Sequence, residues 1–96
     1  MTRMRTVIGK RMQESMQNIP AWQCTVSIDM EACMALRDDY QAHRGVKLSY
    51  NDIMAKAIAV ASRKFPLVNA RYENGEVRVY KHTNVGLAVA LEGALV

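Results

Sequence analysis

The sequence predicts an α+β domain, in which helices pack on one side of a mainly antiparallel or mixed sheet. Two observations support this prediction. Apolar residues recur at helical spacing in three segments and at period two in others, so the expected order of elements is α-β-α-α-β-β-β. Half of the 96 residues are hydrophobic and 23% are charged, a balance typical of a folded chain rather than a disordered one.

The first expected element is a helix from Met4 to Ile19. Its apolar residues fall at positions 4, 7, 8, 12, 16 and 19, which form one stripe on a helix. Ser15 interrupts this stripe near the end of the helix, where a pocket could form. The alternative is a hydroxyl bonded back to a helical carbonyl. Pro20 then ends the helix.

A strand is expected over residues 22–30, because five apolar residues alternate there with polar ones. That period gives a strand one apolar face to bury and one polar face. A second helix follows from Asp29 or Met30 and ends near Gly45, since glycine suits the left-handed conformation of a helix C-cap.

Arg37 lies on the apolar face of the second helix, which it shares with Cys33, Leu36 and Tyr40. No acidic residue stands three or four positions from it. A guanidinium does not lose its proton in a protein, so Arg37 needs a partner from another element.

The third helix is expected to begin at Ser49, whose side chain can cap it, with Asp52 at the reciprocal position of a capping box. Residues 53–65 are apolar nearly all round, which predicts a buried central helix. Pro66 ends this helix.

Further strands complete the expected sheet. Asn74-Gly75 predicts a hairpin within residues 71–81, because both turn residues tolerate positive φ. Residues 85–91 are apolar or small on both faces, which predicts a strand in the sheet interior. The sequence then ends in a hydrophobic run without a closing turn, so the domain is expected to be truncated.

Few residues indicate chemistry by themselves. His43 and His82 lack metal-ligand spacing and are expected to serve at the surface or in capping, and no metal site is expected. Cys24 and Cys33 are expected to be buried free thiols.

Without a long apolar run or a secretory signal, we expect a soluble cytoplasmic protein that has no membrane association. The net charge is +4, but few aromatic residues are present for stacking, so a nucleic-acid-binding role is disfavoured.

Several short segments, in order along the chain, match the pattern of a known family. They are VIGKRM at residues 7–12 with Ser15, IP at 19–20, TVSID at 25–29, LR at 36–37, KLSYNDI at 47–53, KA at 56–57, FPLVNA at 65–70 and NVGLAVA at 84–90. Together they resemble the catalytic domain of dihydrolipoamide acyltransferases, the E2 components of 2-oxoacid dehydrogenase complexes. The resemblance covers essentially the whole chain.

The resemblance implies a fold and an activity. Such domains share the chloramphenicol acetyltransferase fold and form homotrimers that build larger cage-like cores. Their partners are the E1 and E3 components and a lipoyl domain. They move an acyl group between dihydrolipoamide and coenzyme A, with a His of an H-x-x-x-D-G motif as general base and a hydroxyl that stabilises the oxyanion. Neither His43 nor His82 begins that motif. Residues 1–96 are therefore expected to be the N-terminal portion of the domain and to be inactive alone.

The resemblance also implies roles for residues in this segment. Arg37 matches an arginine that braces the H-x-x-x-D-G segment, which would supply the partner that its own helix lacks. Four residues are expected to line the acyl-acceptor side of the channel: Ser15, Ile19, Pro20 and Trp22. The alternative hypothesis is a non-catalytic assembly or interaction module derived from the same fold.

Overall fold

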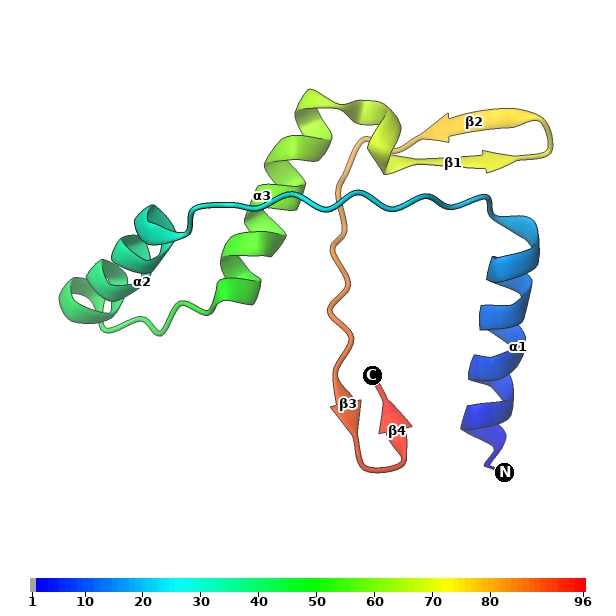
Figure 1. Ribbon diagram of the computed structural model, residues 1–96, viewed down its shortest axis with the longest axis horizontal. Helices are drawn as coiled ribbons and strands as arrows, with labels where there is room; N and C mark the ends of the chain where they lie inside the picture. The colour runs from blue at the N-terminus through cyan, green and yellow to red at the C-terminus, as the bar shows by residue number, and fades with distance from the viewer. Residues whose placement is uncertain (1) are drawn as a thin grey trace. The chain divides into compact units, whose positions relative to one another are not determined.

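The computed structural model describes residues 2–96 (Figure 1). Contacts divide the chain into two compact units. One contains the residues up to Ile28 together with Ala88–Val96, and the other contains Asp29–Leu87. In chain order the elements are α1 (Arg3–Asn18), α2 (Glu31–Arg44), α3 (Tyr50–Lys64), the 3-10 helix η1 (Pro66–Asn69), β1 (Ala70–Glu73), β2 (Glu76–Val79), β3 (Ala90–Leu91) and β4 (Ala94–Leu95). Helices together with antiparallel strands agree with the α+β class.

Helix α1 occupies the residues that the apolar stripe predicts. Thr2 caps its start, because the Thr2 hydroxyl accepts a hydrogen bond from the backbone N–H of Arg5 at 3.3 Å. At the other end the backbone N–H of Ile19 donates to the carbonyl of Ser15 at 3.0 Å. The helix ends before Pro20, as predicted.

Residues 19–30 form no strand, so this part of the sequence-based prediction is wrong. The segment runs between α1 and α2 without regular structure (Figure 1). A strand needs a hydrogen-bonded neighbour. The sheets formed by the described residues are β1–β2 and β3–β4, and neither includes this segment. Its alternating apolar side chains are left in solvent, with Trp22 84% exposed, Val26 72% and Ile28 68%.

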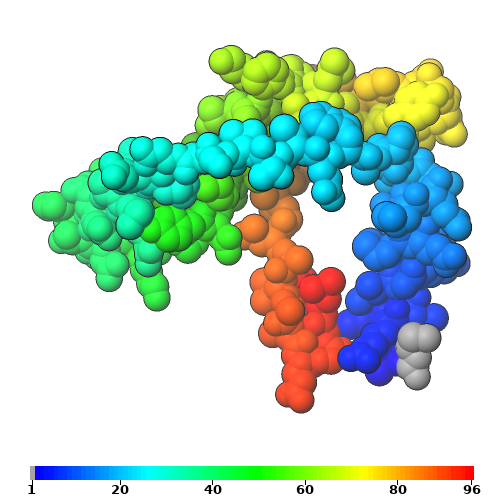
Figure 2. Space-filling model, in the orientation of Figure 1, coloured from blue at the N-terminus to red at the C-terminus, as the bar shows by residue number. Residues whose placement is uncertain are grey.

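Helix α2 ends, and helix α3 begins, at the residues that the sequence predicts. Gly45 adopts φ 64° and forms the C-cap of α2. A residue with a Cβ would be strained in this left-handed conformation. Ser49 caps α3 through a complete capping box. The Ser49 hydroxyl oxygen accepts from the backbone N–H of Asp52 at 3.2 Å, and the Asp52 carboxylate accepts from the backbone N–H of Ser49 at 3.0 Å and from its hydroxyl at 2.8 Å. The two helices contact one another, as Figure 2 shows.

The capping box makes the stability of α3 sensitive to acid. Hydrogen bonds from the backbone N–H and then the hydroxyl of Ser49 hold the pKa of Asp52 below its ordinary value of 3.8. A carboxylate with a lowered pKa stabilises the folded helix above its ordinary pKa, and that contribution is lost as the pH falls through the lowered value. We therefore expect α3 to lose helical signal in circular dichroism as the pH falls below about 3.8.

Two substitutions isolate this acid transition from the titration of other carboxyl groups. Asp52→Asn keeps an acceptor for the Ser49 N–H but has no proton to gain, so its loss of helicity over the same pH range should be smaller. Ser49→Ala removes the hydroxyl but keeps the backbone donor, and should shift the transition towards higher pH. Identical titration curves for all three chains would contradict the prediction.

The sequence predicts that α3 is a buried central helix, and this prediction is wrong for the described chain. None of residues 2–96 is buried. Ile53 and Ala59 are half-buried, while Ile58 and Val60 are exposed. The reason is that α3 packs mainly on α2 and η1, which cover only part of its apolar surface.

The total exposed area shows how much surface remains uncovered. The chain exposes 9411 Å², whereas a folded monomer of this mass exposes roughly 5,500 Å². Exposed apolar side chains account for part of the excess, because they occur on every helix and in both hairpins. Such surface is normally covered by protein.

The predicted hairpin at Asn74-Gly75 is confirmed. β1 and β2 pair antiparallel, and Asn74 and Gly75 have φ 52° and 78°. Two consecutive positive φ values are typical of the type I′ turn, whose twist matches that of the strands.

The last predicted strand is shorter than expected and is not in a sheet interior. Ala90–Leu91 pairs antiparallel with Ala94–Leu95, and Val89 and Val96 exchange two backbone hydrogen bonds at 2.7 and 3.0 Å. The expectation of no closing turn is wrong, because Gly93 adopts φ 70° and the chain reverses between β3 and β4. The sequence predicts one mainly antiparallel or mixed sheet. The strands of the described residues are antiparallel, but they form two separate two-stranded sheets instead of one.

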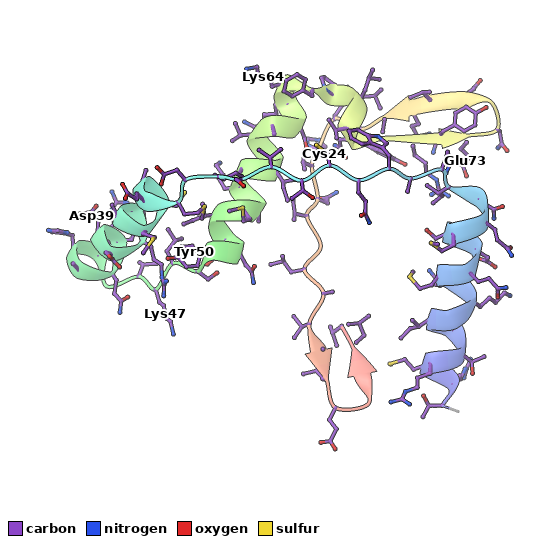
Figure 3. The ribbon with its side chains drawn as sticks, in the orientation of Figure 1. Cys24, Asp39, Lys47, Tyr50, Lys64 and Glu73 are labelled. Atoms are coloured by element: carbon purple, nitrogen blue, oxygen red, sulfur yellow. The ribbon has the colours of Figure 1, made fainter. Side chains whose placement is uncertain are left out.

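The cysteines differ from expectation in one respect. Both are free thiols, but Cys24 is exposed and Cys33 is half-buried, so neither is buried as the sequence-based hypothesis required. Cys24, which Figure 3 labels, belongs to the segment without a pairing strand, and this explains its exposure.

Within the described residues, no helix combines the length and the apolar character that a membrane crossing requires.

Candidate functional site

Arg37 finds its partner on the neighbouring helix, as its place on an apolar face predicts. The guanidinium carbon lies 4.7 Å from the centre of the Tyr50 ring. Tyr50 is the first residue of α3, directly after the capping Ser49; Figure 3 labels it. A cation over an aromatic face is attracted by the ring quadrupole. The contact therefore joins α2 to the start of α3.

The Arg37–Tyr50 contact does not use the N–H donors of the guanidinium. The ion pairs of the described residues join His43 to Asp39 and Arg71 to Glu73, so Arg37 is stacked without a carboxylate partner. Stacking uses the flat face of the guanidinium, while its five N–H donors point outward in the plane. Arg37 can therefore keep its contact with Tyr50 and still donate hydrogen bonds to another segment.

An open groove of about 610 Å³ lies between α2 and α3. Leu36 and Tyr40 contribute from α2, and α3 contributes most of the remainder. The charged residues at the groove are Asp52, which is occupied in the capping box, Lys56 and Lys64. Its lining residues are Leu36, Tyr40, Leu48, Asp52, Ile53, Lys56, Ala57, Val60, Ala61, Lys64 and Phe65. The groove has the character of a packing surface rather than a catalytic pocket.

The four predicted channel residues lie at the end of α1 and just beyond it. Ser15 is half-buried, and its carbonyl accepts the hydrogen bond from Ile19 that closes the helix. Pro20 and Trp22 are exposed in the segment that follows. The structure thus brings Ser15 and Ile19 together. These residues belong to the first unit and Arg37 to the second, so the predicted channel lining stays a prediction.

The histidines occupy the positions expected of surface residues. Nδ1 of His43 lies 2.9 Å from Oδ1 of Asp39, and both side chains are exposed near the C-terminal end of α2. The carbonyl of His82 accepts a hydrogen bond from the Asn69 amide at 3.1 Å. Among residues 2–96 no group of three or more His, Cys, Asp and Glu side chains is arranged to hold a metal ion.

Sequence reasoning missed Tyr50 as the partner of Arg37. The sequence indicated that a partner was needed, but a carboxylate was the obvious candidate, and helical spacing cannot pair residues on different helices. A usable signal was present, since Tyr50 directly follows the capping Ser49 and so has a fixed place at the start of its helix.

The fold and the site together define an α+β segment that carries an arginine–tyrosine contact between two helices and a large uncovered apolar surface. Comparison with known proteins gives its family. The family model for 2-oxoacid dehydrogenases acyltransferase (catalytic domain) matches residues 1–96. The chain belongs to this family.

Relatives in bacteria and in a yeast match over nearly the whole chain. The dihydrolipoyllysine-residue acetyltransferase component of the pyruvate dehydrogenase complex of Zymomonas mobilis is 34% identical over 100% of this chain and 22% of its own length. The corresponding component of Rhizobium meliloti is 37% identical over 97% of this chain and 22% of its own length. The mitochondrial component of Schizosaccharomyces pombe is 36% identical over 100% of this chain and 20% of its own length.

The chain thus spans about a fifth of the length of the relatives that it matches. No solved structure matches it significantly.

Proposed function

We propose that residues 1–96 form the N-terminal portion of an acyltransferase catalytic domain with the chloramphenicol acetyltransferase fold. The complete domain moves an acyl group between dihydrolipoamide and coenzyme A, which are its substrates. The observation that carries this proposal is the family match over all 96 residues, together with relatives named as acetyltransferase components of pyruvate dehydrogenase complexes. The general base is a histidine outside this segment, because neither His43 nor His82 has the required motif.

Arg37 is proposed to be a positioning residue in this domain. Its contact with Tyr50 fixes the guanidinium at the junction of α2 and α3 and leaves its N–H donors free for another segment. That segment is the one that carries the catalytic histidine. A bidentate arginine contact can hold a catalytic loop within the narrow limits that proton transfer requires.

Ser15, Ile19, Pro20 and Trp22 are proposed to line the acyl-acceptor side of the channel. The exposure of Ile19, Pro20 and Trp22 supports this role, because side chains that will meet a substrate or another part of the protein must not be covered by their own helix. Trp22 and Ile19 offer apolar surface to the alkyl part of a lipoyl group, and the Ser15 hydroxyl is a hydrogen-bond donor.

The proposed partners follow from the same family. We propose a homotrimer that builds a larger cage-like core, with E1 and E3 components and a lipoyl domain as partners, in the cytoplasm. The uncovered apolar surface of the helices and hairpins supports an assembled state, because isolated soluble chains rarely leave this much apolar surface in water.

A grafting experiment tests the proposed function. Residues 1–96 replace the matching segment of the Zymomonas mobilis relative, and transfer from acetyl-, succinyl- and branched acyl-CoA to dihydrolipoamide is measured. We expect transfer by the graft, no transfer by the relative without this segment, and no transfer by residues 1–96 alone. Replacing the catalytic histidine of the graft supplies the control for the mechanism and should abolish transfer.

The alternative function is a non-catalytic assembly or interaction module. One observation favours it: the described residues carry abundant uncovered apolar surface, which a partner or further copies could cover. A graft that folds and assembles like its parent, yet transfers none of the acyl groups, would contradict acyl transfer and favour the module.

A further inference from the structure

The β1–β2 hairpin has one face made entirely of charged side chains. Residues that alternate along a strand share a face, and the register places Arg71 opposite Arg78 and Glu73 opposite Glu76. The charged face therefore has a basic row at the base of the hairpin and an acidic row beside the turn. The opposite face carries Tyr72 and Val77, which also lie directly opposite one another.

This arrangement of charges does not favour the hairpin itself. Like charges directly opposite each other in an antiparallel pair are destabilising, and the hairpin contains two such pairs. An ion pair along β1, between Arg71 and Glu73 at 3.5 Å, offsets the repulsion only in part. All four charged side chains are exposed. When other protein covers the apolar face with Tyr72 and Val77, the charged face is the one left available for contacts between subunits.

We propose that this charged face binds the same face of a second copy of the chain. The two hairpins lie face to face and point in opposite directions, related by a two-fold axis perpendicular to the strands. The two rows are two residues apart, roughly 7 Å along the strand. The two-fold therefore sets each basic row over the acidic row of the other copy. Such a contact is isologous, because the surface is complementary to itself.

Charge complementarity selects a second copy as the occupant. A uniformly acidic or basic partner would meet one favourable and one unfavourable row. Hairpins aligned tip to tip would set like charges together, so the same pattern also fixes the orientation. The contact area is small compared with that of a stable dimer. The contact is therefore weak and sensitive to salt, and it orients copies that other surfaces also hold together. The inference does not rest on acyl transfer.

Paired charge variants test the contact. One variant, Arg71→Glu with Arg78→Glu, has an acidic face, and the other, Glu73→Arg with Glu76→Arg, has a basic face. Self-association of the graft, in which residues 1–96 lie within a complete domain, is measured by analytical ultracentrifugation at low salt, and the graft without further substitutions is the original chain of the comparison. Each variant alone should associate at least about tenfold more weakly than the original chain, because four exposed ion pairs become repulsive. An equal mixture of the two should regain the lost association.

The fully inverted variant, with all four charges exchanged, is the matched control. It keeps the net charge and the like-charged rows of the hairpin, and its face is again complementary to itself, so its association should equal that of the original chain. Apolar association is common to all the variants and cancels in the comparison. Equal association of the original chain and both single-sign variants would overturn the proposal, as would failure of the mixture or of the inverted variant to regain it.

Discussion

Replacing Arg37 by alanine in the grafted enzyme is expected to lower kcat about a hundredfold, while KM for dihydrolipoamide changes little. The guanidinium lies over Tyr50, and its in-plane donors stay available for the segment that we propose it braces. Without that support the histidine shifts from its position relative to the attacking thiol, and a displacement of about 1 Å can cost this much in rate. Steady-state kinetics with acetyl-CoA measures both constants.

Two further substitutions separate positioning from stability. Arg37→Lys keeps the charge but loses the planar fork, so it should restore only a small part of kcat. Tyr50→Leu removes the cation–π contact, which contributes about 1 kcal/mol, but the chain keeps the guanidinium and its N–H donors, so kcat should fall far less than with alanine at Arg37. Equal losses in Arg37→Ala and Tyr50→Leu, in step with equal losses of thermal stability, would show that Arg37 only joins the two helices.

The second large effect is on folding cooperativity. We expect residues 1–96 alone to unfold without a sharp thermal transition and to bind a hydrophobic dye strongly, whereas the same residues in the graft unfold cooperatively with little dye bound. The reason is that none of the described residues is buried, and the exposed area of 9411 Å² is far above the roughly 5,500 Å² of a folded monomer of this mass. Differential scanning calorimetry and dye fluorescence provide the measurements.

Two substitutions serve as comparisons in this experiment, one in the α2–α3 groove and one on the exposed surface of α1. Leu36→Ala removes apolar surface at the α2–α3 groove and should lower the melting temperature of the graft, but have little effect on the isolated chain. Lys10→Ala, on exposed α1, should alter neither. A sharp calorimetric transition in the isolated chain would contradict the expectation and show that 96 residues form their own core.

The sequence predicted the helices well because their signals are local. The capping box of Ser49 and Asp52, and Gly45 at the C-cap, act within a few residues, so the sequence itself contains both partners of each contact. The Asn74-Gly75 turn is equally local, and its positive φ values follow from the two residue types.

The sheet could not be predicted in the same way because strand pairing is not local. Residues 22–30 have the period of a strand, but period describes only which side chains share a face and does not supply a neighbour. Gly93 shows the converse error, since a single positive φ turned an apparent interior strand into a short hairpin.

The candidate site was predictable only in part, because its contacts, like strand pairing, are not local in sequence. The sequence showed that Arg37 needed a partner, and the structure was required to identify Tyr50, because that pairing depends on how two helices pack. The proposed roles of Ser15, Ile19, Pro20 and Trp22 depend on groups outside these residues, which neither helical period nor local geometry can supply.

The unpaired segment between α1 and α2 has a consequence for the order of events during synthesis. Capped helices form in microseconds from contacts close in sequence, whereas a strand must wait for a partner distant in the chain. A nascent chain would therefore hold α1, α2 and α3 while Trp22, Val26 and Ile28 remain in solvent. During that interval the alternating apolar residues are open to mispairing with other chains.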